Sequence, residues 1–220
     1  MSGDHRPGTA RGHALILTGG PLPLELGPLP DAEMVIAADE GIDNARQLGI
    51  SVDLLVGDLD SASDGSEAFA GSVQRHPVDK DQTDLELALA AALKAGMQSV
   101  TVVGTMAGRV DHALGNLLLL TADRWQALRI DARIDSARVW VVRDRATIDG
   151  APDDLVSLMV IGGPATGVST SGLAWPLDSA LLESGPGLGM SNRMTGPTAE
   201  LSVQQGVLLV IAPGQEADQN

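Results

Sequence analysis

Four aspartates stand in two short segments whose spacing suits the binding of a divalent cation. Gly57-Asp58-Leu59-Asp60-Ser61 holds two of them, and Asp81-Gln82-Thr83-Asp84 holds the other two. On a strand, side chains two residues apart point to the same face. Like charges held that close are stable only when they are protonated or neutralised. Magnesium takes oxygen ligands and usually meets a protein through one or two carboxylates together with substrate phosphates, so these segments indicate metal-assisted phosphate chemistry.

Each of these charged residues also has an ordinary structural explanation, which the sequence leaves open. Asp58 and Asp60 could be turn or cap residues, since Asp commonly follows a strand. Asp84 falls in the first turn of an expected helix, where the helix dipole stabilises a carboxylate without any ligand. Lys80 and Asp81 precede that helix in an expected exposed loop, and Lys80 could simply be a solvated charge.

A third polar segment runs from Gly104 to His112, just ahead of and into another expected helix. Its small residues allow the backbone to approach a ligand closely, and amides at the start of a helix favour anions. Arg109, His112 and Asn116 fall at helical spacing and share one helix face, which suits contact with a phosphate or a ribose. For His112 alone, a solvated position is an equal alternative.

Composition bounds the class of protein. The chain has 220 residues, 44% of them hydrophobic, which is enough for a sizeable core. Acidic residues outnumber basic ones 29 to 14, and the net charge of -15 argues against nucleic-acid or anionic-membrane partners. A phosphate ligand must therefore bring positive charge with it. The absence of cysteine excludes disulfides, zinc thiolate sites and thiol nucleophiles. Without an apolar signal core or a membrane-length apolar run, we expect a cytoplasmic protein.

Strands and helices alternate in the first part of the chain. Short apolar runs typical of buried parallel strands lie at residues 14–18, 34–38, 53–56 and 99–103. Helical spacing is present at residues 41–48, 83–95 and about 109–125. Thr83 and Glu86 form a capping box at the start of the second helix. We therefore expect a doubly wound, mostly parallel sheet with flanking helices, whose strand ends carry the ligand site.

The pattern changes after about residue 130. Short β-type runs at residues 139–142, 155–161, 199–203 and 207–211 are separated by turns rich in glycine and proline. This arrangement predicts a smaller antiparallel β-sandwich. We expect an α/β domain over residues 1–130 and a β-sandwich domain over residues 131–220.

Motifs of several other enzyme classes are missing from the sequence. The chain has two lysines, Lys80 and Lys94, and neither follows a glycine, which excludes a P-loop. No dinucleotide-binding glycine motif follows a strand, and neither a zinc-protease motif nor a serine nucleophile elbow is present.

The polar segments taken together resemble the thiamine pyrophosphokinase family over about residues 14–212. In the first part the resemblance rests on Ala38–Gly41, Gly57–Ser61, Lys80–Asp84 and Gly108–His112. In the second part it rests on Val156–Leu158, Ser169–Leu173, Trp175–Leu177 and Met190–Asn192. The resemblance implies transfer of the pyrophosphoryl group of ATP to the hydroxyl of thiamine, with magnesium required. The products would be thiamine diphosphate and AMP.

The same resemblance implies that residues 1–130 form the catalytic domain that binds ATP and magnesium and that the β-sandwich of residues 131–220 binds thiamine. It also implies roles for individual residues. Magnesium and the triphosphate would be held by the catalytic residues Asp58, Asp60, Asp81 and Asp84. ATP would be bound along Asp39, Lys80, Arg109, Asp111, His112 and Asn116. Family members are homodimers that hold thiamine between the nucleotide domain of one subunit and the sandwich of the other. Thiamine would then contact Trp175, Ser191 and Asn192, although Trp175 could instead be a buried core residue.

Two positions depart from the family pattern, and two alternative functions stay open. Glu40 and Ala107 stand where glycine is usual, and their side chains could narrow the phosphate loop. The chain could be a catalytically silent nucleotide-binding or regulatory homologue. It could also be a pyrophosphokinase that acts on another alcohol, such as a pterin.

Overall fold

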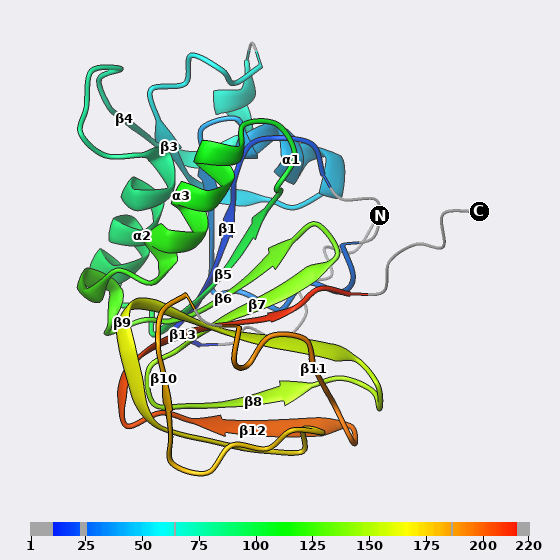
Figure 1. The fold of residues 1–220 in the computed structure, drawn as a ribbon. Coiled ribbons are helices and arrows are strands. Elements are labelled where there is room, and N and C mark those ends of the chain that lie inside the picture. Colours follow the sequence, from blue (N-terminus) through cyan, green and yellow to red (C-terminus); the bar gives the residue numbers. More distant parts are fainter. Residues whose placement is uncertain (1–10, 23–25, 64, 186, 215–220) are drawn as a thin grey trace. The chain divides into compact units, whose positions relative to one another are not determined.

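The computed structural model describes residues 11–22, 26–63, 65–185 and 187–214 (Figure 1). The described residues up to 119, with residues 127–135, form one compact unit, and residues 120–126 with those from 136 onward form a second. The sequence places the domain boundary after residue 130, whereas the first unit extends to residue 135. Among the helices of the described ranges, none is both long and apolar enough to cross a membrane.

The first unit is built on a parallel sheet, as expected. Its strands are β1 (His13–Leu17), β2 (Met34–Ala38), β3 (Val52–Gly57), β4 (Ala70–Arg75), β5 (Ser99–Gly104) and β6 (Arg129–Ile134). They lie in the order β4-β3-β2-β1-β5-β6, and every neighbouring pair is parallel. Apolar runs do not predict β4, whose side chains are mostly exposed, or β6, whose buried positions alternate with polar ones. Neither strand carries the continuous apolar run of a fully buried strand.

Helices cover both faces of this sheet. They are α1 (Gly41–Leu48), α2 (Asp84–Lys94) and α3 (Val110–Leu120), and a short 3-10 turn lies at η1 (Ser66–Phe69). A second 3-10 turn, η2 (Asp123–Trp125), falls in the second unit. Leu15 and Leu17 of β1 share a hydrophobic cluster with Ile42 of α1. Ile16, fully buried between them, points to the opposite face, and α2 contacts the same strands. The doubly wound arrangement is therefore confirmed.

Local sequence signals set the ends of these helices. The predicted capping box is present, because Thr83 Oγ1 accepts a hydrogen bond from Glu86 N–H at 3.2 Å and Glu86 Oε2 accepts one from Thr83 N–H at 2.9 Å. This box fixes Asp84 in the first turn of α2. The helix predicted for about 109–125 ends earlier, at Leu120. It is followed by an extended backbone at Ala122 (ψ 141°) and the separate turn η2.

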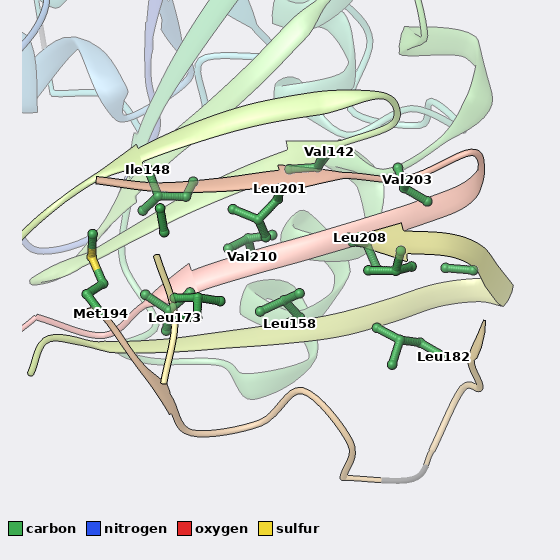
Figure 2. Packing of buried hydrophobic residues seen from close by; sticks show 14 residues of the cluster. Val142, Ile148, Leu158, Leu173, Leu182, Met194, Leu201, Val203, Leu208 and Val210 are labelled. Atoms are coloured by element: carbon green, nitrogen blue, oxygen red, sulfur yellow. The ribbon is translucent and has the colours of Figure 1, made fainter. Parts of the chain in front are cut away.

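The second unit is an antiparallel β-sandwich, also as expected. Its strands are β7 (Ala137–Val142), β8 (Arg145–Asp149), β9 (Leu155–Ser171), β10 (Ala180–Leu182), β11 (Asn192–Arg193), β12 (Thr198–Ser202) and β13 (Gln205–Ala212). The long strand β9 pairs with β13 along its first part and with β12 at its end, so it belongs to both layers. Leu158, Leu201 and Leu208 meet between the layers (Figure 2).

Candidate active site

Pairing of β2 with β3 brings the first two aspartates of the candidate site together. Asp39 follows β2 and Asp58 follows β3, and the two strands are parallel neighbours. Asp39 N–H donates a hydrogen bond to Val56 O at 2.8 Å, which fastens the end of β2 to β3. Asp39 (φ 48°) and Leu59 (φ 64°) adopt left-handed backbone conformations. Such conformations are uncommon outside glycine and concentrate at functional sites.

Four carboxylates gather at this edge of the sheet. One oxygen each of Asp39, Asp58 and Asp60 lies within 4.8 Å of the others. A Cβ built on Gly57 would lie 3.2 Å from both Asp39 Cβ and Asp84 Oδ1, so Asp84 adjoins the same group. The absence of a side chain at Gly57 is what leaves room for this approach. We call Asp39, Asp58, Asp60 and Asp84 the carboxylate cluster.

Lys80 lies inside the carboxylate cluster. Its Nζ donates a hydrogen bond to Asp58 Oδ2 at 2.7 Å and lies 3.2 Å from Asp84 Oδ1. Only 14% of its side chain is exposed, so the alternative that Lys80 is a solvated charge is wrong. Asp58 Oδ1 accepts a longer hydrogen bond, 3.3 Å, from Asp60 N–H. Both oxygens of Asp58 therefore have partners within the protein.

The charges of the site shift one another's ionisation. Burial raises the pKa of Asp39, and the neighbouring carboxylates of Asp84, Asp58 and Asp60 raise it further, against a lowering hydrogen bond from the Glu40 backbone. The hydrogen bond from Lys80 lowers the pKa of Asp58. Burial alone would lower the pKa of Lys80, but its contacts with Asp58 and Asp84 outweigh burial and raise it. The site thus holds more negative charge than its single ammonium neutralises.

The donor atoms of the cluster fit a hard divalent cation. Asp39 Oδ1 is buried and has no hydrogen-bond partner. Asp84 Oδ1 is also buried and accepts no well-aligned hydrogen bond, although Lys80 Nζ is near. Buried carboxylate oxygens without partners are unusual and costly, and oxygen-only ligand sets suit magnesium. The residues present therefore fit a magnesium ion.

The carboxylate cluster does not contain the same residues as the metal-ligand set that the sequence predicts. Asp81 is exposed and is not among the described carboxylates that approach one another within 4.8 Å. Asp39, predicted as a nucleotide contact, belongs to the carboxylate cluster and has a buried oxygen without a hydrogen-bond partner. No spacing rule connects Asp39 with Asp58 and Asp60, because only the pairing of β2 with β3 joins them. The role of Asp81 stays a prediction.

Two loops flank the point where the strand order reverses, between β1 and β5. In the loop after β1, Gly20 N–H donates to Glu40 Oε2 at 3.1 Å, and Asn44 Nδ2 donates to Thr18 O at 2.8 Å and Gly20 O at 2.9 Å. A Cβ built on Gly20 would lie 2.7 Å from Thr105 Cγ2 in the loop after β5, so the loops adjoin. Ligands of doubly wound sheets bind at this point. No sequence motif predicts that Glu40 and Asn44 anchor the first loop.

The loop after β5 is held by Asp135, which sequence reasoning also missed. Its carboxylate accepts hydrogen bonds from Thr105 Oγ1 at 2.6 Å and from Met106 N–H at 2.9 Å. Ala107, one of the two departures from the family pattern, is exposed, and its N–H donates to Thr105 Oγ1 at 3.0 Å. The loop is thus fixed before α3 begins.

The predicted nucleotide contacts on α3 lie near its start and along its surface. Arg109 and Asp111 are exposed and bind each other through hydrogen bonds of 3.1 and 2.5 Å. The hydrogen bond from Arg109 lowers the pKa of Asp111 to about 2. His112 is exposed and Asn116 is partly buried. The three exposed side chains are accessible to a ligand, and Asp111 is not a member of the carboxylate cluster.

In the second unit, Trp175 and Asn192 lie together. Trp175 is 61% exposed, so the alternative of a buried core tryptophan is wrong. Asn192 is 4% exposed, and its amide accepts from Trp175 N–H at 3.1 Å and donates to Trp175 O at 2.8 Å. Its side chain therefore holds the backbone of Trp175. Ser191 is exposed, and its N–H donates to Ser157 Oγ at 3.0 Å.

The fold and the site together define a two-unit α/β protein with a carboxylate cluster at the strand ends of the first unit and an antiparallel β second unit. Residues 29–131 match the family model described as thiamin pyrophosphokinase, catalytic domain. Residues 145–208 match the model described as thiamin pyrophosphokinase, vitamin B1 binding domain. The chain belongs to the thiamine pyrophosphokinase family.

Individual relatives agree with this assignment. A thiamine pyrophosphokinase of Bacillus subtilis is 27% identical over 206 residues, which cover 89% of this chain and 96% of the relative. The crystal structure of the thiamine pyrophosphokinase from Bacillus subtilis superposes with a TM-score of 0.81 at 25% identity, covering 93% of this chain and all of that one. A family protein from Enterococcus faecalis has the same fold, with a TM-score of 0.81 at 22% identity over 93% of this chain and 100% of that one.

The charge balance of the cluster predicts that Asp39→Asn stabilises the protein in the presence of a chelator. The change removes a buried carboxylate that its neighbours repel, and we expect the melting temperature at neutral pH to rise by about 2–4 °C. The folded-state pKa of Asp39 is raised. The penalty for its negative charge is therefore fully present above that pKa and vanishes below the ordinary pKa of aspartate.

Calorimetry across pH measures this effect. The gain in melting temperature should shrink as the pH falls through the raised pKa of Asp39 and disappear in more acidic buffer. Asp149→Asn, at an exposed position of the second unit, is the matched control and should leave the melting temperature unchanged. A loss of stability in Asp39→Asn at neutral pH would show that the charge of Asp39 does not destabilise the fold.

Proposed function

We propose that this protein transfers the pyrophosphoryl group of ATP to the hydroxyl of thiamine, giving thiamine diphosphate and AMP. The observation that carries the proposal is the carboxylate cluster with its unpartnered Asp39 oxygen, placed at the sheet edge where doubly wound folds bind nucleotides. Membership of the thiamine pyrophosphokinase family supports both the substrate pair and the direction of transfer.

The proposed mechanism depends on positioning and on neutralisation of charge. Magnesium, when bound, would offset the charge of the triphosphate. We propose that Asp58, Asp60, Asp81 and Asp84 hold it, with Asp39 as an additional ligand that the geometry suggests. Phosphoryl transfer needs little covalent chemistry from the protein, so aligning the thiamine hydroxyl with the β-phosphorus would supply most of the rate. A carboxylate of the cluster that is not engaged by the ion would accept the hydroxyl proton.

The remaining nucleotide contacts follow the edge of the sheet toward α3. Lys80 would bind a phosphate through its ammonium, while Arg109 and Asn116 would line the nucleotide from the helix with Asp111 and His112. The exposure of Arg109, Asp111 and His112 supports this role, since their side chains are accessible to a ligand. The pairing of Arg109 with Asp111 holds the guanidinium in one orientation, which suits recognition of a phosphate or ribose.

Thiamine recognition is assigned to the second unit. Thiamine is a flat cation, and the exposed indole of Trp175 can stack on its ring and attract its charge. Asn192 would act by holding the Trp175 backbone, and Ser191 is exposed beside it. We keep Ser191 as a proposed direct contact.

We further propose that the protein acts as a homodimer. Val110, Leu114 and Leu118 of α3 are 72%, 52% and 42% exposed and stand four residues apart, so they form one apolar stripe along the helix. An exposed apolar stripe of this kind marks a contact surface. The second unit exposes apolar side chains of its own, including Leu181 and Met190. A second copy of the chain, with thiamine between the first unit of one subunit and the second unit of the other, would cover them.

The first prediction from the proposed reaction concerns Asp58. Wild-type protein with ATP, magnesium and thiamine should release AMP and thiamine diphosphate in equal amounts, as measured by chromatography. Asp58→Asn should lower the turnover number by at least about a hundredfold, because the ligand set and the position of Lys80 are both lost. Asp149→Asn, far along the chain and exposed, should keep wild-type turnover.

If wild-type protein with thiamine releases no AMP, the same assay with other alcohols distinguishes the two alternative functions. If wild-type protein binds ATP but releases no AMP with any alcohol, the chain is a catalytically silent homologue. If a pterin alcohol replaces thiamine as the better substrate, the chemistry stands and the assignment of thiamine is wrong.

The second prediction tests the indole. Trp175→Ala should raise KM for thiamine by about 2- to 30-fold, which corresponds to the loss of a cation–π contact of about 0.5–2 kcal/mol. KM for ATP should stay the same. Trp175→Phe keeps an aromatic face and should retain most of the affinity. Equal effects of Trp175→Ala on both Michaelis constants would show that the residue acts on the fold instead.

The third prediction tests the dimer. Leu114→Glu places a charge in the apolar stripe of α3 and should convert the protein from dimer to monomer in sedimentation-velocity experiments. Leu48→Glu, on α1, is the matched control and should remain dimeric. A wild-type protein that sediments as a monomer at micromolar concentration would refute this part of the proposal.

A further inference from the structure

The position of Lys80 conflicts with simple metal binding by the carboxylate cluster. Its ammonium engages Asp58 Oδ2 at 2.7 Å and lies 3.2 Å from Asp84 Oδ1, two of the oxygens that the proposed function assigns to magnesium. The other oxygen of Asp58 already accepts a hydrogen bond from Asp60 N–H. The ammonium of Lys80 therefore occupies the position that a metal ion bound to both Asp58 and Asp84 would need.

Hydrogen bonds hold the backbone around Lys80, and only its side chain reaches the cluster. Lys80 N–H donates to Val78 O at 3.0 Å, which turns the chain just before the residue, and the Thr83 capping box fixes the start of α2 just after it. The backbone on either side is thus held while the side chain spans the gap. Because a lysine stem has four rotatable carbons, its charged end can move several ångströms without any change of backbone.

We infer that Lys80 is the resident counter-cation of the carboxylate cluster and that metal and nucleotide must arrive together to displace it. An ammonium and a divalent cation cannot share the same two oxygens, since like charges repel strongly at contact distance. When a metal ion binds alone, displacing Lys80 from its two carboxylates costs free energy that nothing offsets. The phosphates of a bound nucleotide offset this cost, because they give Lys80 a new anionic partner. This inference rests on the proposed function and adds a positioning role for Lys80 in ordering the binding steps.

One consequence follows for the binding of the free ion. Lys80 should make the cluster a poor site for a bare divalent cation, although the cluster carries four carboxylates. By thermodynamic reciprocity, nucleotide should strengthen metal binding by the same factor as metal strengthens nucleotide binding. Removal of the Lys80 charge should weaken this coupling and strengthen binding of the bare ion.

The two lysines of the chain allow a matched test. Manganese binding to the full-length protein is measured without nucleotide, by the loss of the free Mn²⁺ signal in electron paramagnetic resonance. Lys80→Met keeps the stem and removes the charge, and it should tighten Mn²⁺ binding by at least about tenfold. Lys94→Met removes the same charge from the last turn of α2, where Lys94 is exposed, and should stay within about twofold of wild type.

A second pair of variants guards against effects on folding. Lys80→Gln should behave like Lys80→Met, and Lys80→Arg, which keeps the charge, should bind Mn²⁺ as weakly as wild type. Circular dichroism confirms the fold of each variant. General damage to the site would weaken metal binding, so a tighter site in both uncharged variants cannot come from misfolding. Equal or weaker Mn²⁺ binding in Lys80→Met and Lys80→Gln overturns the inference.

A nucleotide arm separates this inference from the proposed function. With a non-hydrolysable ATP analogue present, wild-type protein should gain Mn²⁺ affinity by a larger factor than Lys80→Met does. An unchanged factor in the variant overturns the role of Lys80, while release of AMP from ATP and thiamine by wild-type protein would still uphold the reaction. Absence of that release would refute the reaction, whatever the Mn²⁺ affinities of the variants.

Discussion

The mutual repulsion of four carboxylates, offset by one lysine, is the constraint on which the site depends. Asp39, Asp58, Asp60 and Asp84 are drawn to one edge of the sheet by strand pairing and by the start of α2, and Lys80 lies among them. Charges of one sign held this close raise the free energy of the fold unless a cation joins them. The site therefore carries excess negative charge, which a positively charged ligand can neutralise. The buried oxygen of Asp39 without a hydrogen-bond partner is the clearest sign of this excess.

The backbone around the cluster is shaped to tolerate this crowding. Gly57 leaves the space in which Asp39 and Asp84 approach each other, and the left-handed conformations of Asp39 and Leu59 turn the chain sharply at the strand ends. Polar side chains fix the neighbouring loops, with Glu40 and Asn44 holding the loop after β1 and Asp135 the loop after β5. A rigid frame of this kind fixes charged groups before a ligand arrives, which is the condition for catalysis by positioning.

The second unit shows the same division between groups that hold and groups that are free to bind. Asn192 uses its amide on the backbone of Trp175 and Arg193, so it has little capacity left for a ligand. The indole that it positions is exposed. Asn192 thus acts by orienting the exposed aromatic residue beside it. A sequence motif alone does not distinguish such a positioning residue from one that contacts the ligand.

The sequence by itself determined the classes of structure and most of the residue types at the site. Apolar runs predicted the buried parallel strands, and the Thr83–Glu86 capping box marked the start of α2, because these signals are local. The segments around Asp58 and Asp84 are likewise local, and from them the sequence predicts magnesium-assisted phosphate chemistry. Tertiary structure alone decided which charges meet. Asp39 joins the cluster through the pairing of β2 with β3. Lys80 lies in the cluster, although the sequence is equally compatible with a solvated side chain there, and Asp81 stays exposed. The physical reason is that Coulomb interactions act through space. Strand pairing sets the distances between these charged groups, and spacing along the chain does not reveal them.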